Sequence, residues 1–209
     1  MGRYSGPVCR LCRREGMKLF LKGTRCNMAK CPIETGRPPP GMHGQRRGRK
    51  QSDYGVQLRE KQRLRRQYGL QEAQFRLFFA RAARRRTVTG DLLLQMLETR
   101  LDNVVYRLGF APSRRAARQF IGHSHVRVNQ RRASVPSMLL KPGAVITVKD
   151  RAQSRELARR SLELSEGRPV PPWLTLDEKN FSGVVVRMPT REEIAPIVDE
   201  QLVVELYSK

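Results

Sequence analysis

Apolar positions repeat at helical spacing in the part of the chain that follows residue 50. We expect one helix over residues 53–68, capped by Ser52 or Asp53 and ended by Gly69. A second helix is expected over residues 71–86, where apolar residues again recur every three or four positions. Its apolar stripe, which we interpret as core rather than as a base-stacking surface, comprises Phe75, Phe78 and Phe79.

The helical pattern continues in shorter segments beyond these two helices. They are expected at residues 91–99, 102–108, 113–122 and 151–165. Gly109 closes the second of them, and Ser113 caps the third. We expect Ala116, Ala117, Phe120 and Ile121 to pack inward, which would leave the arginines of residues 113–122 facing outward.

Short alternating apolar stretches predict strands near and after these helices. Val126 and Val128 alternate with Arg127, and Asn129-Gln130 is expected to turn the chain into a hairpin. The other strand candidates are residues 144–148, 184–188 and 202–207. A short helical turn at Glu192-Glu193 is expected between the last two candidates.

The four cysteines of the chain all fall within its first 31 residues. Cys9, Cys12, Cys26 and Cys31 follow the spacing C-x2-C-x13-C-x4-C, in which two close pairs are separated by a loop. Such spacing can place four thiolates around one metal ion, and nearby basic residues favour the thiolate form. Zinc in a structural role is the leading prediction, because four protein ligands leave no position open for catalysis. An iron–sulfur cluster and two disulfides are the alternatives that the spacing leaves open.

A basic segment rich in proline and glycine follows the cysteines, over residues 37–50. Its prolines disfavour a helix, and its glycines allow backbone amides to approach a phosphate closely. We expect an extended arm that becomes ordered on RNA, with a disordered linker as the alternative. His43 lies in this arm without a nearby acid or nucleophile in the sequence, so we interpret it as a phosphate-contacting residue.

Together these elements predict an α+β protein in four segments. Residues 1–44 form a four-cysteine metal knuckle and an extended basic arm, and residues 45–98 form a helical RNA-binding domain. Residues 99–165 form a small module of helices and a hairpin. Residues 166–209 supply C-terminal strands and a loop that pack back on the body.

The charge of the chain favours a polyanionic partner. Its 209 residues include 42 Lys and Arg against 19 Asp and Glu, a formal net charge of +23. Residues 1–89 carry 23 basic and 5 acidic residues, so most of the surplus lies there. Arginine outnumbers lysine, and its planar fork suits both phosphate and bases. No apolar stretch fits a signal peptide or a membrane span, and the charge is too widely spread for one membrane-binding helix.

The segment 100–121 carries the most specific motif. Arg100-Leu101-Asp102-Asn103-Val104-Val105-Tyr106-Arg107-Leu108-Gly109-Phe110, followed by 113–121, resembles the RNA-binding domain named after ribosomal small-subunit protein four. In that family, two helices and a short hairpin form an RNA-binding surface. Ser124, Gln130 and Ala144 stand where the family usually has Gly, Gly and Asp, so we expect an altered hairpin.

Motifs elsewhere extend the resemblance to nearly the whole chain. They include Pro39-Pro40-Gly41-Met42-His43-Gly44-Gln45, Leu58-Arg59-Glu60-Lys61-Gln62 and Gln201-Leu202-Val203-Val204-Glu205. The chain is identified as a member of bacterial family four of the small-subunit ribosomal proteins, in the branch that carries cysteines. The resemblance implies a primary binder of small-subunit ribosomal RNA that nucleates assembly in the cytoplasmic ribosome. It also implies small-subunit protein five as a neighbour, proximity to the messenger RNA entrance and a contribution to translational accuracy.

Candidate RNA contacts are the basic and polar residues of the knuckle, the arm, the first long helix and the module. They are Arg3, Arg10, Arg13, Arg14, His43, Gln45, Arg46, Arg47, Arg49, Lys50, Arg59, Lys61, Arg63, Arg66, Arg114, Arg115, Arg118 and His123. Helix starts and arginines both favour phosphate.

Two other function classes compete with RNA binding. Arg100-Leu101-Asp102 matches the catalytic triplet of pseudouridine synthases, but the rest of the chain is too short and too basic to supply their catalytic domain. We find no nucleophile–base grouping and no nucleotide-binding loop, so we predict no enzyme. A zinc-bearing transcription factor is disfavoured because the chain lacks a heptad seam and a clear recognition helix.

Overall fold

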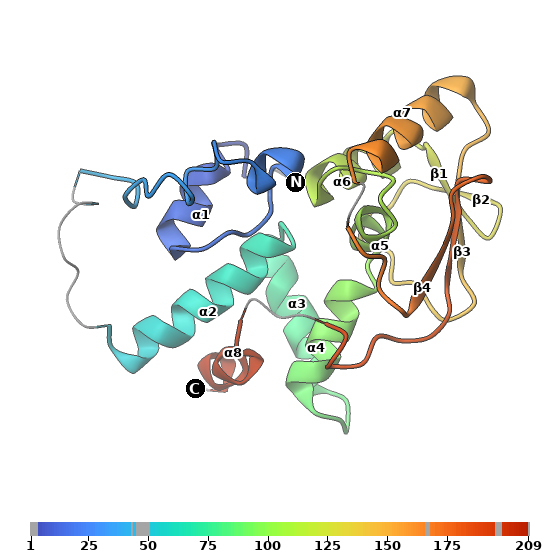
Figure 1. The fold of residues 1–209 in the computed structure, drawn as a ribbon. Helices are drawn as coiled ribbons and strands as arrows, with labels where there is room; N and C mark the ends of the chain where they lie inside the picture. Colours follow the sequence, from blue (N-terminus) through green and yellow to red (C-terminus); the bar gives the residue numbers. More distant parts are fainter. Residues whose placement is uncertain (1–3, 43, 45–50, 166–167, 195–197, 209) are drawn as a thin grey trace. The chain divides into compact units, whose positions relative to one another are not determined.

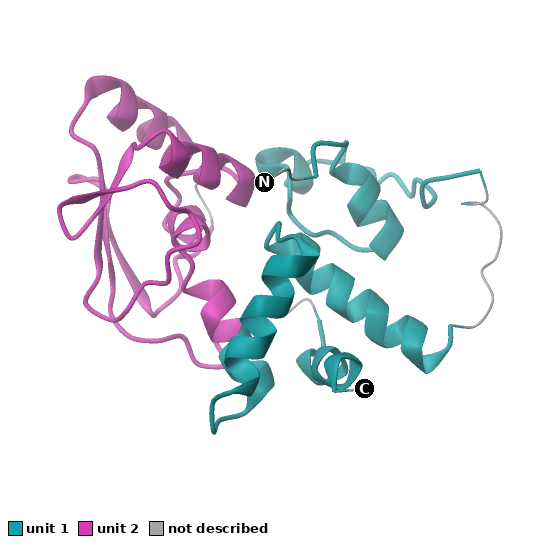
Figure 2. Ribbon diagram, turned by 180° about the vertical axis from the view of Figure 1, so that it is seen from behind, with its two compact units in different colours: residues 1–93, 196–209 teal, residues 94–195 magenta. Residues whose placement is uncertain are grey.

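The computed structural model describes residues 4–42, 44, 51–165, 168–194 and 198–208. The chain divides into two compact units, residues 1–93 with 196–209 and residues 94–195 (Figure 2). Their elements are labelled in Figure 1. Among the described residues, no helix is long and apolar enough to cross a membrane. The mixture of helices and one sheet confirms the α+β prediction.

Unit 1 consists of helices and loops. They are α1 (Cys9–Glu15), the 3-10 helix η1 (Gly23–Asn27), α2 (Asp53–Gln67), α3 (Glu72–Ala83) and α8 (Glu200–Tyr207). Helix α4 (Thr89–Glu98) contains the boundary with unit 2. The Ser52 side chain caps α2 by accepting a hydrogen bond from the Gly55 amide at 3.3 Å, as the sequence predicts. Phe75 and Phe78 of α3 are buried, which confirms that the phenylalanine stripe is core.

The last element is a helix, not the strand predicted for residues 202–207. Asp199 caps α8 by accepting a hydrogen bond from the Gln201 amide at 2.9 Å. Helical geometry puts Val203 and Tyr207 on one face, where Val203 is fully buried. The Tyr207 ring stacks on Phe79 with the ring centroids 4.6 Å apart, and α8 lies against α2 (Figure 1). Packing within unit 1 therefore overrides the strand preference of the valines.

Unit 2 is built on a five-stranded antiparallel sheet in the order β2-β1-β3-β5-β4. The strands are β1 (Val126–Val128), β2 (Arg131–Ala133), β3 (Val145–Val148), β4 (Leu174–Asp177) and β5 (Ser182–Val185). Helices α5 (Leu101–Arg107), α6 (Arg114–Gly122) and α7 (Ala152–Glu163) pack around one core with this sheet. The strand predicted at 184–188 is found two to three residues earlier, as β5, and β4 was not predicted because its segment follows a proline-rich stretch.

The β1–β2 hairpin forms despite the two residues that replace glycine. Asn129 and Gln130 both have positive φ, 48° and 66°, as a type I′ turn requires. The Asn129 side chain accepts a hydrogen bond from the Val145 amide at 2.8 Å, which ties the turn to β3. Ser124 also adopts a positive φ of 62° and accepts a hydrogen bond from Arg132 at 2.8 Å. The turn therefore forms at Asn129-Gln130 without glycine, supported by hydrogen bonds at neighbouring positions.

Candidate nucleic-acid interface

The predicted RNA contacts that the structure describes fall in three groups. Helix α1 carries Arg10, Arg13 and Arg14, and α2 carries Arg59, Lys61, Arg63 and Arg66. Unit 2 carries Arg114, Arg115, Arg118 and His123, on α6 and directly after it. Arg3, His43, Gln45, Arg46, Arg47, Arg49 and Lys50 lie outside the described residues. RNA contact by any of these side chains stays a prediction.

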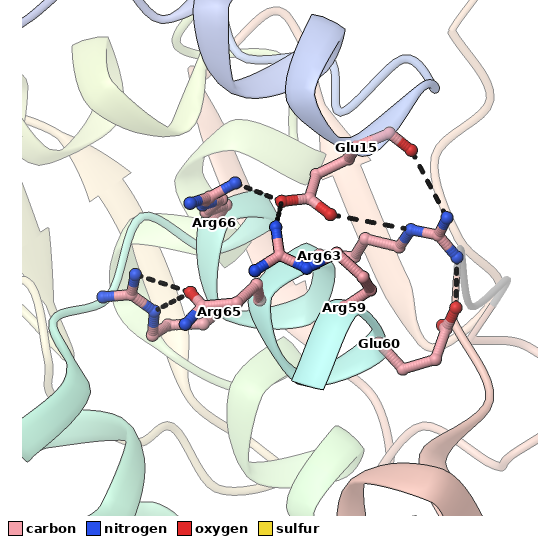
Figure 3. Close-up of polar contacts among 7 residues, drawn as sticks. Glu15, Arg59, Glu60, Arg63, Arg65 and Arg66 are labelled. Carbon is pink, nitrogen blue, oxygen red and sulfur yellow. Dashed lines mark hydrogen bonds and ion pairs between the residues drawn. The ribbon is translucent and has the colours of Figure 1, made fainter. Parts of the chain in front are cut away.

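Three arginines of α2 converge on one carboxylate of α1 (Figure 3). Glu15 is the last residue of α1, and its side chain is fully buried. Arg59 Nη1 lies 3.2 Å from Glu15 Oε1, Arg66 Nη1 contacts the same oxygen, and Arg63 Nε lies 3.9 Å from Oε2. The arginines lie at spacings of four and three, so they share one face of α2. This face, which the sequence predicts to contact RNA, is directed at Glu15 of the knuckle.

A second acidic side chain, Glu60, extends this charged cluster along α2. Arg63 also pairs with Glu60, whose second oxygen accepts a hydrogen bond from the Asp199 amide at 3.3 Å. Arg65 lies on a different side and donates to Gln62 at 2.7 and 3.0 Å (Figure 3). The side chains of α2 therefore connect α1 with the start of α8 inside unit 1.

Lys61 is held inside unit 1 and is only 7% exposed. Its Nζ lies 2.8 Å from Glu72 Oε1, and the Tyr207 hydroxyl donates to the same oxygen at 2.7 Å. Burial raises the pKa of Glu72, but hydrogen bonds from Lys61 and Tyr207 outweigh it and bring that pKa below its ordinary value. Burial and the Glu72 carboxylate raise the pKa of the Tyr207 phenol. Lys61 therefore ties α2 to α3 and α8 within this network.

The knuckle contacts the start of the basic arm. Arg13 Nη1 donates to the Pro38 carbonyl at 3.0 Å. Arg10 and Arg13, with residues 38–42 and Gly44, line a recess of about 490 Å³. Arg10 and Arg14 are exposed. The described part of the arm therefore runs beside cationic side chains of α1.

All four cysteines are among the described residues, and none forms a disulfide. Cys12, Cys26 and Cys31 are buried, and the Cys26 sulfur accepts a hydrogen bond from the Lys22 amide at 3.4 Å. Burial raises the pKa of the Cys12 and Cys26 thiols, and the other cysteines raise both further. The thiolate form, which we expected nearby cations to favour, is therefore disfavoured by burial at these two positions.

The donor set suits a structural metal in its chemistry, since four thiols lie in one small basic knuckle. As placed, however, no three Cys, His, Asp or Glu side chains of the described residues are grouped closely enough to hold a metal ion. Metal binding by Cys9, Cys12, Cys26 and Cys31 therefore remains a prediction.

Two of the three arginines on α6 are not turned outward, contrary to the sequence-based expectation. Arg114 Nε donates to Asn103 Oδ1 at 2.8 Å, and its guanidinium lies 4.6 Å from the centre of the Tyr106 ring. Arg118 Nη1 pairs with Asp102 Oδ2 at 3.1 Å. Arg115 alone among the three is exposed. The buried polar groups of α5 hold the other two, and helix periodicity on its own does not reveal them.

The Arg100-Leu101-Asp102 triplet is part of the core of unit 2. Arg100 is fully buried and donates to Asp102 Oδ1 at 3.0 Å and Oδ2 at 2.7 Å. Burial raises the pKa of Asp102 even though Arg100 lowers it. Asn103 beside it donates to the Glu98 carboxylate at 2.7 Å. A buried ion pair inside a packed core has no access to a nucleotide substrate, which removes the catalytic interpretation.

The two histidines after α6 differ in their surroundings. His123 is exposed, whereas His125 Nδ1 lies 2.9 Å from Ser154 Oγ and its ring stacks on Phe120 at 4.9 Å. Burial lowers the pKa of His125, and His123, Arg151 and Lys149 lower it further. His123 therefore keeps the accessibility that its predicted RNA contact needs.

Two features of these groups were missed by sequence reasoning. Glu15 is the only acidic residue among the first 33, and that isolation among basic residues was the available signal. Arg168 was also missed; its guanidinium lies 4.4 Å from the centre of the Tyr106 ring. Tyr106 and Arg168 are 62 positions apart, and no local pattern links them.

Comparison with known proteins gives matches over the full length. Residues 3–98 match the family described as Ribosomal protein S4/S9 N-terminal domain, and residues 99–146 match the S4 domain. The chain is 56% identical to small ribosomal subunit protein uS4 of Thermus thermophilus. It is 55% identical to that of Natranaerobius thermophilus and 54% identical to that of Geobacter metallireducens. Each alignment covers all of both chains.

Proposed function

Because this chain belongs to the family of small ribosomal subunit protein uS4, we propose that it is a primary binder of small-subunit ribosomal RNA. It is a structural protein of the small ribosomal subunit, not an enzyme. Its role is to fold early onto a multi-helix region of that RNA and so nucleate assembly. Full-length similarity to uS4 proteins is the observation that carries this proposal.

The charge distribution supports RNA as the ligand. Residues 1–89 carry a net charge of +18, and phosphate contacts dominate the affinity of proteins for nucleic acids. Arg10, Arg14 and Arg115 are exposed cations on α1 and α6 that can reach a phosphate backbone. The match of residues 99–146 to the S4 domain supports a further RNA-binding region in unit 2.

A competition experiment tests the proposal. Labelled small-subunit ribosomal RNA bound to the full chain is challenged, at one fixed salt concentration, with the same RNA unlabelled or with duplex DNA. We expect the ribosomal RNA to compete far better than duplex DNA of equal phosphate content. Equal competition would show that binding is nonspecific and would contradict the proposed role.

The finer parts of the role rest on the family resemblance. We propose that small-subunit protein five is a neighbour in the cytoplasmic ribosome, and that the chain lies near the messenger RNA entrance. There it would contribute to translational accuracy together with that neighbour. Chemical crosslinking in assembled subunits tests both contacts.

We also propose that Cys9, Cys12, Cys26 and Cys31 hold one structural metal ion, with zinc as the first candidate and an iron–sulfur cluster as the alternative. The chemistry of four free thiols within one small basic knuckle supports this. The bound metal would supply folding energy to residues 1–44 rather than chemistry.

A further inference from the structure

The geometry of the α1–α2 cluster points to a phosphate-binding site whose arginines are held in place by Glu15. We propose that Arg59 and Arg66 bind one RNA backbone phosphate, and that buried Glu15 is their positioning residue. This inference rests on the proposed function and deepens it, because it assigns a role to an acidic residue inside a basic surface.

Positive charge exceeds negative charge around Glu15. Three guanidiniums surround one carboxylate, and within the described part of the chain only Arg63 also pairs with a second acid, Glu60. Burial lowers the pKa of Arg66, Glu15 raises it, and the nearby Arg59, Arg65 and Arg14 lower it again. A second anion at this point would therefore relieve repulsion among the cations.

The guanidinium groups of Arg59 and Arg66 are suited to bind a second anion. Each contact with Glu15 uses one terminal nitrogen, Nη1, and a guanidinium carries five N–H donors in a planar fork. The side chains of Arg59 and Arg66 are 20% and 19% exposed, so solvent reaches part of each. A phosphate approaching from solvent can bind the same forks that Glu15 holds from inside.

Glu15 is well suited to hold these forks still. Its side chain is fully buried, and its Oε2 has no hydrogen-bond partner among the described residues. A buried carboxylate depends strongly on its ion pairs, so separating the arginines from it is unfavourable. Arginines that are already ordered lose less side-chain entropy when they bind a phosphate.

The substitution Glu15→Gln distinguishes a positioning role of Glu15 from the effect of its charge alone, because the two predict opposite changes in RNA affinity. Glu15→Gln keeps the shape but removes one negative charge, which by simple electrostatics should strengthen RNA binding. If Glu15 positions the arginines, affinity for small-subunit ribosomal RNA should instead fall about tenfold, the equivalent of one charge-assisted contact. Glu34→Gln is the matched control, since Glu34 is a half-exposed acid of the same knuckle that pairs with Lys18.

Filter binding of the full chain at several salt concentrations provides the readouts. We expect Glu15→Gln to bind more weakly than Glu34→Gln, with the slope of log affinity against log salt reduced by about 0.7 to 0.9 for each phosphate that the variant no longer neutralises. A lower stability alone would not change that slope below the melting temperature. Binding by Glu15→Gln as tight as that of Glu34→Gln, with an unchanged slope, would overturn the inference.

A second pair of variants applies if Glu15→Gln fails to fold. Arg66→Lys keeps the charge and leaves Glu15 with Arg59 and Arg63, but it removes the fork. Arg65→Lys is its control, because Arg65 pairs with Gln62 and Glu72 instead of Glu15. We expect only Arg66→Lys to weaken binding, and equal affinity of the two variants would reject the site. If the wild-type chain itself shows no preference for ribosomal RNA, the proposed function fails instead.

Discussion

Arg114 and Arg115 are neighbours on α6 but have different surroundings, so their substitution should separate folding from RNA binding. Arg115 is exposed, whereas Arg114 bonds Asn103 and covers the Tyr106 ring. Arg115→Ala should reduce RNA affinity about tenfold and leave the melting temperature nearly unchanged. Arg114→Ala should lower the free energy of unfolding by roughly 1–3 kcal/mol, because a buried acceptor loses its donor.

Thermal melting and RNA binding of both variants check this prediction. An Arg114→Ala variant as stable as the wild type would mean that the Arg114 side chain contributes nothing to the core. Unchanged RNA affinity for Arg115→Ala would remove the exposed face of α6 from the interface.

The apolar residues of α6 show where sequence reasoning succeeds at the level of single residues, and the arginines beside them show where it fails. Helix periodicity directs Ala116, Ala117, Phe120 and Ile121 into the core; the last three are buried, and Ala116 is partly buried against that core. The same periodicity could not show that Asp102, 16 positions before Arg118, draws that arginine inward. Local spacing predicts apolar burial, whereas polar partners depend on contacts distant in sequence.

At the scale of elements, helices with local caps were predicted well. Ser52 and Ser113 both cap the helices assigned to them, because an N-cap acts within one turn. Residues 202–207 were predicted as a strand because the local sequence pattern was the only guide. The helix α8 that they form is stabilised by its packing in unit 1, which that pattern does not show. The turn at Asn129-Gln130 forms without glycine because bonds to β3 support it.

The contact of α3 with α2 and α8 predicts a pH dependence of stability. The pKa of Glu72 is below its ordinary value of 4.5 in the folded chain, so this carboxylate contributes stability above about pH 4.5. That contribution is lost as the pH falls through the folded pKa. The stability difference between the wild type and Glu72→Gln should therefore be largest near neutral pH and shrink in acid.

Chemical denaturation at a series of pH values measures that difference. Glu34→Gln, at an acid outside this network, serves as the control and should show a smaller effect. A Glu72 difference that stays constant down to about pH 3, well below the ordinary carboxyl pKa, would contradict the role of the Lys61–Glu72–Tyr207 network.

The four-cysteine knuckle predicts a local effect of removing one ligand. If the four cysteines hold one metal ion, as proposed, Cys12→Ser should release it and loosen residues 1–44, while unit 2, whose core contains no cysteine, stays folded. Metal analysis and amide hydrogen exchange check the two parts separately. Purified wild-type protein with neither zinc nor iron, and with no free thiols, would indicate disulfides instead.

At the scale of the whole molecule, the positive charge is unevenly distributed and serves both internal ion pairs and the proposed RNA contacts. Residues 1–89 hold the larger share of the surplus, and part of it is neutralised inside unit 1 by Glu15, Glu60 and Glu72. Composition predicted the class of ligand, but it could not divide the cations between internal ion pairs and RNA. That division depends on the folded positions of the few acids.

The salt dependence of RNA binding tests the central claim most directly, because it counts phosphates neutralised by the whole chain. Affinity for small-subunit ribosomal RNA is measured from low to high salt, and log affinity is plotted against log salt concentration. Each neutralised phosphate contributes about 0.7 to 0.9 to the slope, so about six contacts would give a magnitude of roughly four to five. We predict a slope at least this steep, and a slope of about one or less would contradict an extended phosphate-binding surface.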